Sequence, residues 1–258
     1  MLHALSANYN QYLDTRHASQ FGERGLGHLV VTPAGRGPDG FYFEVAEADT
    51  FEVWADVARH YRLNPDQVAM GGISMGGIGT YRLALRYPDL FGYLYPVVAG
   101  PGDAEPRLAS LRNVPTTMWA ALLDELQPVT TTEAAVTALD ELGYRYDAYL
   151  FQTWDHLTPS TYDYYQPMAD AVGDAQVLRD PQLETGTIDV VSEGFGLADA
   201  VPESLPPEAG VLTGGHHDPA PYLRRQLVWA DPESIPAADR IVLSATNIAT
   251  VTIHPERA

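Results

Sequence analysis

The stretch Gly-Gly-Ile-Ser-Met-Gly-Gly at positions 71–77 is the feature that most constrains the fold of this chain. Its two leading glycines end the short apolar run 67–72, which begins after the turn-forming residues 64–66 and is typical of a buried strand. It precedes residues 78–89, where apolar side chains recur at helical spacing until a proline. A G-x-S-x-G sequence between a strand and a helix is typical of a nucleophile elbow. We therefore predict that Ser74 is a nucleophile; an ordinary glycine-rich turn is the alternative.

Strands and helices alternate through the first two thirds of the chain. This alternation favours a mostly parallel sheet covered by helices on both faces. From about residue 177, prolines and glycines become frequent and helical periodicity fades. We therefore predict an α/β domain over 1–176 and a β-rich region over 177–258. The further strands are expected at 28–35, 92–100, 114–123, 146–153, 187–193, 222–230 and 240–254, and the further helices at 130–143 and at 49–61, where Asp49 and Glu52 resemble a capping box.

Composition narrows the partners and the chemistry. The net charge is −19 and all fifteen basic residues are arginine, so nucleic acid and anionic membrane surfaces are unfavourable partners. No apolar run approaches the ~18 residues of a membrane span, and no signal peptide is visible. The absence of cysteine excludes disulfides, a thiolate nucleophile and cysteine metal sites. We expect no cofactor. His216, His217 and Asp218 stand together and could hold a metal, but we expect none, because adjacent histidines point apart in an extended chain.

Residues that could activate Ser74 follow it in a definite order. A serine hydroxyl needs a base within hydrogen-bond reach, and the base is oriented by an acid. On a parallel sheet of the nucleophile-elbow type the chain order is serine, acid, histidine, each after a strand. Asp124 follows the strand predicted at 114–123, and His156 follows the strand at 146–153. We predict Asp124 as the acid and His156 as the base, with Glu125 and then Asp103 as rival acids.

The oxyanion of an acyl-transfer reaction requires backbone N–H donors. We expect one from Met75, at the start of the elbow helix, and one from Leu5 in the loop 2–10. Tyr9 and Trp154 lie next to these loops and are candidates for a substrate pocket, although packing in the core is an equal interpretation.

The residues above resemble those of the α/β-hydrolases, and in particular the secreted, actinobacterial serine hydrolases similar to esterase D and prolyl oligopeptidase. The resemblance is carried by LHALSANYNQY, DVARHYRLNPDQVAMGGISMGGIGTYRLALRYPDLF, LRNVPTTMWAALLDELQPV and FQTWDHLTP, within about residues 2–170. It implies hydrolysis of small-molecule or polymeric esters, aromatic ones included, through an acyl-enzyme on Ser74. It also implies secretion, and it carries over Asp124, His156, Met75 and Leu5 in the roles given above.

Two other functions stay open on the sequence. A peptidase of the prolyl-oligopeptidase type usually has a large amino-terminal propeller, for which this chain has no room, so an esterase is favoured. A hydrolase-derived fragment or polymer-binding module without activity is the second alternative.

The start of the chain departs from the family pattern. In the family a full strand precedes the LHALSAN loop, whereas here only Met1 and Leu2 remain of it and the two strands before it are absent. Three explanations stay open: a truncated product, a piece completed by another chain (a homodimer included), or a variant in which the β-favouring run 241–253 fills the gap next to 28–35 and the elbow strand.

Overall fold

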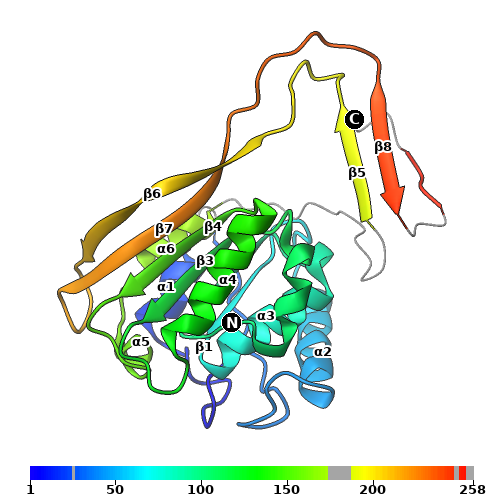
Figure 1. Cartoon of the computed structure of the whole chain (residues 1–258). Helices are drawn as coiled ribbons and strands as arrows, with labels where there is room; N and C mark the ends of the chain where they lie inside the picture. The colour runs from blue at the N-terminus through cyan, green and yellow to red at the C-terminus, as the bar shows by residue number, and fades with distance from the viewer. Residues whose placement is uncertain (25–26, 174–186, 247–249, 254–258) are drawn as a thin grey trace.

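The computed structural model describes residues 1–24, 27–173, 187–246 and 250–253, and its centre is a six-stranded sheet (Figure 1). The strand order is β1-β2-β3-β4-β7-β6. The first four strands are parallel neighbours, and β7 and β6 add to β4 in antiparallel pairing. The bounds of the six are β1 (Ala69–Ile73), β2 (Tyr93–Val97), β3 (Thr116–Ala121), β4 (Tyr146–Phe151), β6 (Val201–Leu212) and β7 (Ala220–Ala230).

Helices cover both faces of the parallel part of the sheet. On one face α2 (Val45–His60), α3 (Met75–Arg86) and α4 (Val129–Leu142) pack over a core that contains Tyr81, Leu85 and Leu139. On the other face α1 (Arg16–Gly22) and α6 (Gln166–Val172) enclose a second, aromatic-rich core. The strands between them are buried on both sides, as the near-continuous apolar runs of the sequence indicate. The predicted mostly parallel sheet of the α/β-hydrolase type is therefore confirmed.

Two sequence predictions in the first third of the chain are wrong. Residues 28–35 form no strand and run past the sheet without pairing to it. Asp49 is not a helix cap, because α2 already begins at Val45. The Asp49 carboxylate instead accepts a hydrogen bond of 2.8 Å from the Gly35 N–H and pairs with Arg36 at 3.1 Å. Asp49, which lies on α2, therefore holds the loop at Gly35 and Arg36 against this helix.

The β-rich end of the chain contributes to two separate sheets. The predicted strand at 222–230 is β7, whose Leu227 lies in the core. Its partner β6 was not predicted, because its sequence contains three prolines, Pro202, Pro206 and Pro207. Proline is tolerated on an edge strand, where the missing N–H faces solvent. The strands β5 (Thr187–Ser192) and β8 (Ile241–Thr246) pair with each other and lie apart from the main sheet (Figure 1).

The pairing of β8 with β5 corrects the expectation that the run 241–253 fills the gap beside β1. Among the described residues, only Leu2 pairs with the outer edge of β1, through a single parallel bridge to Gly72 and a 2.8 Å hydrogen bond from its N–H to the Gly71 carbonyl. The Met1 amino group is buried and donates to the Val31 carbonyl at 2.6 Å. Burial lowers the pKa of this amine to about 5.

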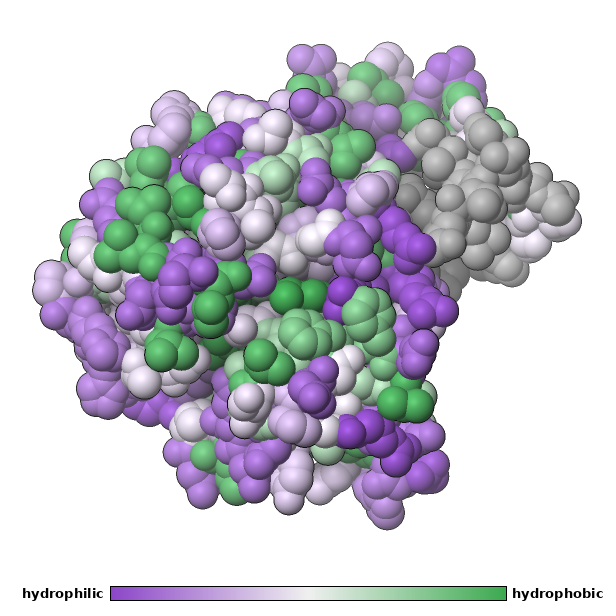
Figure 2. All heavy atoms as spheres, turned by 60° about the horizontal axis from the view of Figure 1, so that its bottom comes forward, coloured by the Kyte–Doolittle hydropathy of each residue, from purple (hydrophilic) through white to green (hydrophobic). Residues whose placement is uncertain are grey.

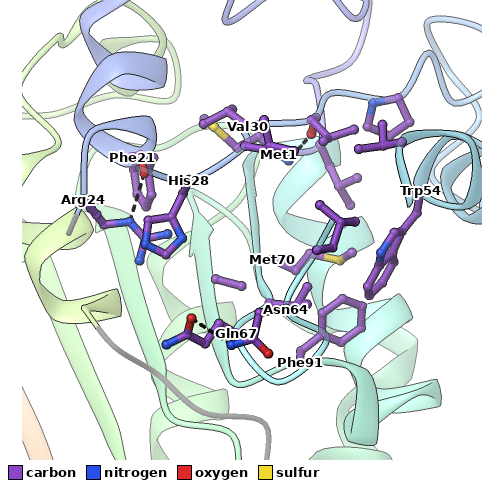
Figure 3. Close-up of a pocket in the computed structure, with 18 of the residues that line it drawn as sticks. Met1, Phe21, Arg24, His28, Val30, Trp54, Asn64, Gln67, Met70 and Phe91 are labelled. Atoms are coloured by element: carbon purple, nitrogen blue, oxygen red, sulfur yellow. Dashed lines mark hydrogen bonds between the residues drawn. The ribbon is translucent and has the colours of Figure 1, made fainter. Parts of the chain in front are cut away.

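A groove of about 360 Å³ lies along this open edge (Figure 3). Trp54, Met70 and Phe91 present apolar surface to it, and Arg24 and His28 lie on the opposite side. The gap that the sequence predicts beside β1 is therefore present, and no strand among the described residues fills it.

Candidate active site

Ser74 occupies the turn between β1 and α3 with a backbone φ of 56° and ψ of −118°. Positive φ is unfavourable for a residue with a side chain, and such strain is concentrated at functional sites. Glycines make the turn possible, since a Cβ on Gly72 or Gly76 would collide with the carbonyl oxygen of Leu2. The Ser74 N–H donates to the Val97 carbonyl at 2.9 Å, which fixes the turn to β2.

The structure brings the side chains of Ser74, His156 and Asp124 into one hydrogen-bonded row. His156 Nε2 lies 2.8 Å from the hydroxyl oxygen of Ser74. The other ring nitrogen, Nδ1, lies 2.8 Å from both carboxylate oxygens of Asp124. The Asp124 side chain is fully buried and that of His156 nearly so. A nucleophile, a base and an orienting acid require this arrangement.

The rival acids do not reach His156. Asp124 follows β3 directly, and its Oδ1 accepts hydrogen bonds from the N–H groups of Leu126 and Gln127 at 2.9 and 2.7 Å. Its neighbour Glu125 is exposed to solvent. Asp103 is paired with Arg82 at 3.1 Å.

The loops that carry Asp124 and His156 are joined through their backbones. The N–H of Leu123 donates to the Trp154 carbonyl at 2.9 Å, so the ends of β3 and β4 are held together. Directly before the histidine, Asp155 accepts hydrogen bonds from the Thr158 hydroxyl and N–H at 2.7 and 2.8 Å. The bonds from Thr158 keep the pKa of Asp155 below its usual value. The short helix α5 (Thr158–Thr161) thus fixes where the His156 loop ends.

The two predicted oxyanion donors occupy different settings. Met75 is the first residue of α3, where helix geometry leaves the N–H without an intrahelical acceptor. Leu5 lies in an exposed turn between Ala4, whose N–H donates to the Gln11 side chain, and Ser6, whose N–H donates to the Pro38 carbonyl. His3 anchors this turn, because its ring lies 3.0 Å from the Ala34 carbonyl and 2.9 Å from the Ala4 carbonyl.

The prediction that Trp154 lines a pocket is wrong, and that for Tyr9 stays a prediction. Trp154 is 1% exposed and stacks on Phe151 with ring centroids 3.7 Å apart, so it packs in the core. Tyr9 is 56% exposed, and it has no aromatic stacking partner among the residues described.

Large apolar side chains are exposed on the loops that carry Asp124 and His156 and on the loop 2–10. They directly precede Asp124, follow it by two positions, follow His156, and lie in the loop of the expected oxyanion donor. The face turned forward in Figure 2 shows hydrophobic side chains gathered between polar ones. We call the exposed leucines of these loops the leucine rim: Leu5, Leu122, Leu123, Leu126 and Leu157. The sequence could have indicated it, since leucines adjoin both Asp124 and His156.

A cavity of about 240 Å³ lies beside the elbow, and no motif in the sequence predicts it. Ile73, the residue before Ser74, forms part of its wall. The other lining residues come from the loop before α1, from α1 and from α5 with the residues after it: Gln11, Tyr12, Thr15, Arg16, His17, Ser160, Thr161, Tyr162 and Asp163.

The sequence 214–219 does not assemble a metal site in the described structure, where no group of three potential ligands is found. His217 lies 2.7 Å from the Thr161 hydroxyl, and Asp218 accepts from the backbone of Gly214. The same described residues contain no helix with the length and apolarity needed to cross a membrane.

Comparison with known proteins points to esterases. The Esterase family model, described as "Putative esterase", matches residues 48–150, a segment that includes Ser74 and Asp124 and ends before His156. No curated protein matches the chain. The family match covers less than half of the chain, and it supports the coarse class of ester hydrolase.

Solved structures that resemble the chain include several esterases. A ferulic acid esterase aligns over 66% of this chain and 79% of its own, with 17% identity and a TM-score of 0.49. A variant of Arabidopsis thaliana SOBER1 aligns over 66% and 95%, with 15% identity and a TM-score of 0.49. A thermostable esterase aligns over 50% of this chain with 20% identity and a TM-score of 0.40, and the chain spans only 34% of that protein's length. Likenesses at these scores establish no shared activity.

Proposed function

We propose that the chain is a serine esterase that hydrolyses carboxylic esters through an acyl-enzyme on Ser74. The observation that carries the proposal is the hydrogen-bonded row from Ser74 through His156 to Asp124 on a strained strand-to-helix turn. An ordinary glycine-rich turn does not require a buried histidine and a buried carboxylate to be hydrogen-bonded in line with its serine.

Acylation follows from the position of each atom. In the tautomer that donates Nδ1–H to Asp124, His156 Nε2 is free to accept the proton of the Ser74 hydroxyl. The serine oxygen then adds to the ester carbonyl carbon. The resulting oxyanion takes hydrogen bonds from the Met75 and Leu5 N–H groups. Collapse of this intermediate breaks the bond to the alcohol, which leaves with the proton from His156.

Deacylation repeats these steps with water. His156 accepts a proton from a water molecule, the hydroxide oxygen adds to the acyl carbon, and the serine oxygen leaves with the proton returned by His156. The products are the free acid and the starting enzyme. Asp124 stabilises the imidazolium in both halves and stays ionised.

Esters are favoured over peptides by the surroundings of the row. The leucine rim presents uncharged, apolar surface on the loop 2–10 and on the loops that carry Asp124 and His156, and this suits an apolar acyl or alcohol group. The Esterase family match over 48–150 agrees with this choice. A peptidase is the second candidate, because an ester bond and a peptide bond can both be cleaved through a serine acyl-enzyme.

The proposal is tested by comparing release of p-nitrophenol from p-nitrophenyl butyrate with release of p-nitroaniline from a prolyl p-nitroanilide. The wild-type protein is expected to cleave the ester and not the anilide, and Ser74→Ala is expected to cleave neither. Ser19→Ala, an exposed serine on α1, is the matched control and should retain ester turnover. Cleavage of the anilide alone would establish a peptidase. If neither substrate is cleaved, the result favours the inactive hydrolase-derived fragment or binding module.

A further inference from the structure

We propose that Gln11 and Tyr42 are positioning residues for the esterase reaction. Their side chains hold the backbone just before Leu5 and so direct its N–H toward the oxyanion. This inference rests on the proposed function and assigns roles to two residues that lie outside the hydrogen-bonded row.

The chain before Leu5 passes directly over the first turn of α3. A Cβ on Gly76, the second residue of this helix, would collide with the Leu2 carbonyl oxygen and lie 3.0 Å from the His3 carbonyl oxygen. The backbone of these two residues therefore touches the turn that begins with Met75. Leu5 follows shortly after this contact, so the two expected oxyanion donors belong to neighbouring segments.

The Leu5 N–H is open to a ligand, whereas the N–H groups on either side of it are not. The Ala4 N–H donates to the Gln11 side-chain oxygen at 2.6 Å. The Ser6 N–H donates to the Pro38 carbonyl at 2.9 Å. Within the described residues the Leu5 N–H has no acceptor. A backbone donor left open between two fixed neighbours suits an oxygen that becomes negatively charged in the reaction.

The peptide between His3 and Ala4 is held at both of its polar ends. Gln11 accepts from its N–H, and the Tyr42 hydroxyl donates to its carbonyl oxygen at 3.2 Å. A peptide unit is planar, so fixing both ends fixes its plane. Only the two backbone torsions of Ala4 separate this plane from the peptide that carries the Leu5 N–H. Gln11 and Tyr42 therefore restrict the direction in which that N–H points.

The following peptide, between Ala4 and Leu5, is held at its carbonyl end only. The Ala4 carbonyl accepts from the Ala7 N–H at 3.1 Å, and the His3 ring nitrogen Nδ1 lies 2.9 Å from it. The N–H end of the same peptide stays open. Together the two held peptides make a preformed donor, which needs no reorganisation when charge develops on the substrate oxygen.

Tyr42 is placed for this role by its own surroundings. It is 1% exposed, and a Cβ on Gly79 of α3 would collide with its ring. Burial raises the pKa of Tyr42, so the hydroxyl keeps the proton that it donates. The backbone at Phe41, Tyr42 and Glu44 has positive φ values of 46°, 57° and 45°. Backbone strain of this kind is concentrated at functional sites, which agrees with the proposed role.

The test compares kcat and KM for p-nitrophenyl butyrate in folded variants. Gln11→Met retains the length of the side chain and removes the acceptor oxygen, and Tyr42→Phe retains the ring and removes the donor. Removal of a whole oxyanion donor typically costs about 10²–10³ in kcat. A misdirected donor should cost part of this, so we expect Gln11→Met to lower kcat by about tenfold with KM unchanged. Tyr42→Phe should lower kcat by a smaller factor, because its bond is longer.

A pair of inhibitors separates positioning of the oxyanion donor from general damage to the site. The Ser74 hydroxyl oxygen adds to an alkyl trifluoromethyl ketone and passes its proton to His156, which leaves a negatively charged oxygen in the position of the oxyanion. The corresponding alcohol cannot form this adduct. Gln11→Met should weaken inhibition by the ketone by about tenfold, in parallel with kcat, and leave inhibition by the alcohol unchanged.

Gln20→Met is the matched control. The Gln20 side-chain oxygen also accepts from a backbone N–H, that of Tyr165, at 2.7 Å, but Gln20 lies on α1 and not in the loop before it. Because Gln20 is the more deeply buried of the two glutamines, its replacement should lower the melting temperature at least as much as Gln11→Met does. It should leave kcat unchanged.

Two results would overturn the inference. If Gln11→Met and Tyr42→Phe, or whichever of them folds, retain the wild-type kcat, these side chains do not position the donor. If inhibition by the ketone and inhibition by the alcohol weaken equally, the side chains affect binding in general. In both cases ester cleavage by the wild-type protein leaves the proposed function intact. A wild-type protein that cleaves no ester would contradict the proposed function, and this inference with it.

Discussion

His156 Nδ1 lies 2.8 Å from both carboxylate oxygens of Asp124, and both side chains are buried. A carboxylate has no proton to donate, so this contact requires the proton to reside on Nδ1. The tautomer in which Nε2 faces Ser74 as an acceptor follows directly. The pair thus determines which nitrogen can act as the base.

The first prediction concerns this tautomer. Asp124→Asn places an amide against Nδ1 and favours the wrong tautomer, so kcat should fall by about 10⁴ while the protein stays folded. Initial rates with p-nitrophenyl butyrate and the circular dichroism spectrum check both parts. Glu125→Gln is the matched control and should retain wild-type activity; if it is the inactive variant, Glu125 is the acid instead.

The second prediction concerns the elbow. A Cβ on Gly76 would collide with the Leu2 carbonyl oxygen, which is backbone and cannot move without breaking the bridge to Gly72. Gly76→Ala should lower the free energy of unfolding by about 1–3 kcal/mol, the typical cost of overpacking, and should lower activity. Urea denaturation measures it. Gly194→Ala, where the nearest atom lies 3.6 Å away, should change neither quantity.

The third prediction concerns the carboxyl-terminal strands. Leu227 of β7 is 3% exposed and belongs to the same core as α3 and α4. Leu227→Ala should therefore cost about 2–5 kcal/mol of unfolding free energy. Val242→Ala on β8, 49% exposed, should stay within about 0.5 kcal/mol. Equal effects of the two substitutions in thermal unfolding would contradict the inclusion of β7 in the main core.

The fourth prediction concerns pH and His17. Its folded-state pKa of about 3 lies below the ordinary value of 6.5, because burial penalises the charged form. Between these values the unfolded chain binds a proton that the folded chain does not, so stability falls as pH decreases from 6.5 toward 3. The slope from this residue approaches about 1.4 kcal/mol per pH unit well below pH 6.5 and is smaller near neutrality. In urea unfolding at pH 7 and pH 5, the free energy of unfolding of His17→Phe should therefore change less with pH than that of the wild type. An unchanged pH dependence would show that His17 is not buried in the neutral form.

Much of the fold could be predicted because local pattern and burial agree there. The strands β1 to β4 are apolar runs ended by turns, and α3 and α4 show clear helical periodicity. The row of Ser74, Asp124 and His156 follows from chain order, since parallel strands bring their carboxyl ends to one edge of the sheet. The geometry agrees with that order, and the catalytic roles remain proposals.

Other features depend on contacts that the sequence does not encode locally. Residues 28–35 have strand composition but find no partner edge, and β6 has three prolines yet pairs as an edge strand. Trp154 adjoins the His156 loop in sequence but points into the core. The cavity beside the elbow joins residues from α1, β1 and α5, which no single motif connects.

Whether Ser74 is the nucleophile can be measured by the intact mass of the protein after reaction with a fluorophosphonate. We expect one adduct per chain, located on the peptide that contains Ser74, formed slowly in His156→Ala and absent in Ser74→Ala. Adduct formation should run parallel to the loss of p-nitrophenyl butyrate hydrolysis. An adduct that persists in Ser74→Ala, or ester turnover that survives complete labelling, would contradict the assignment of Ser74 as the nucleophile.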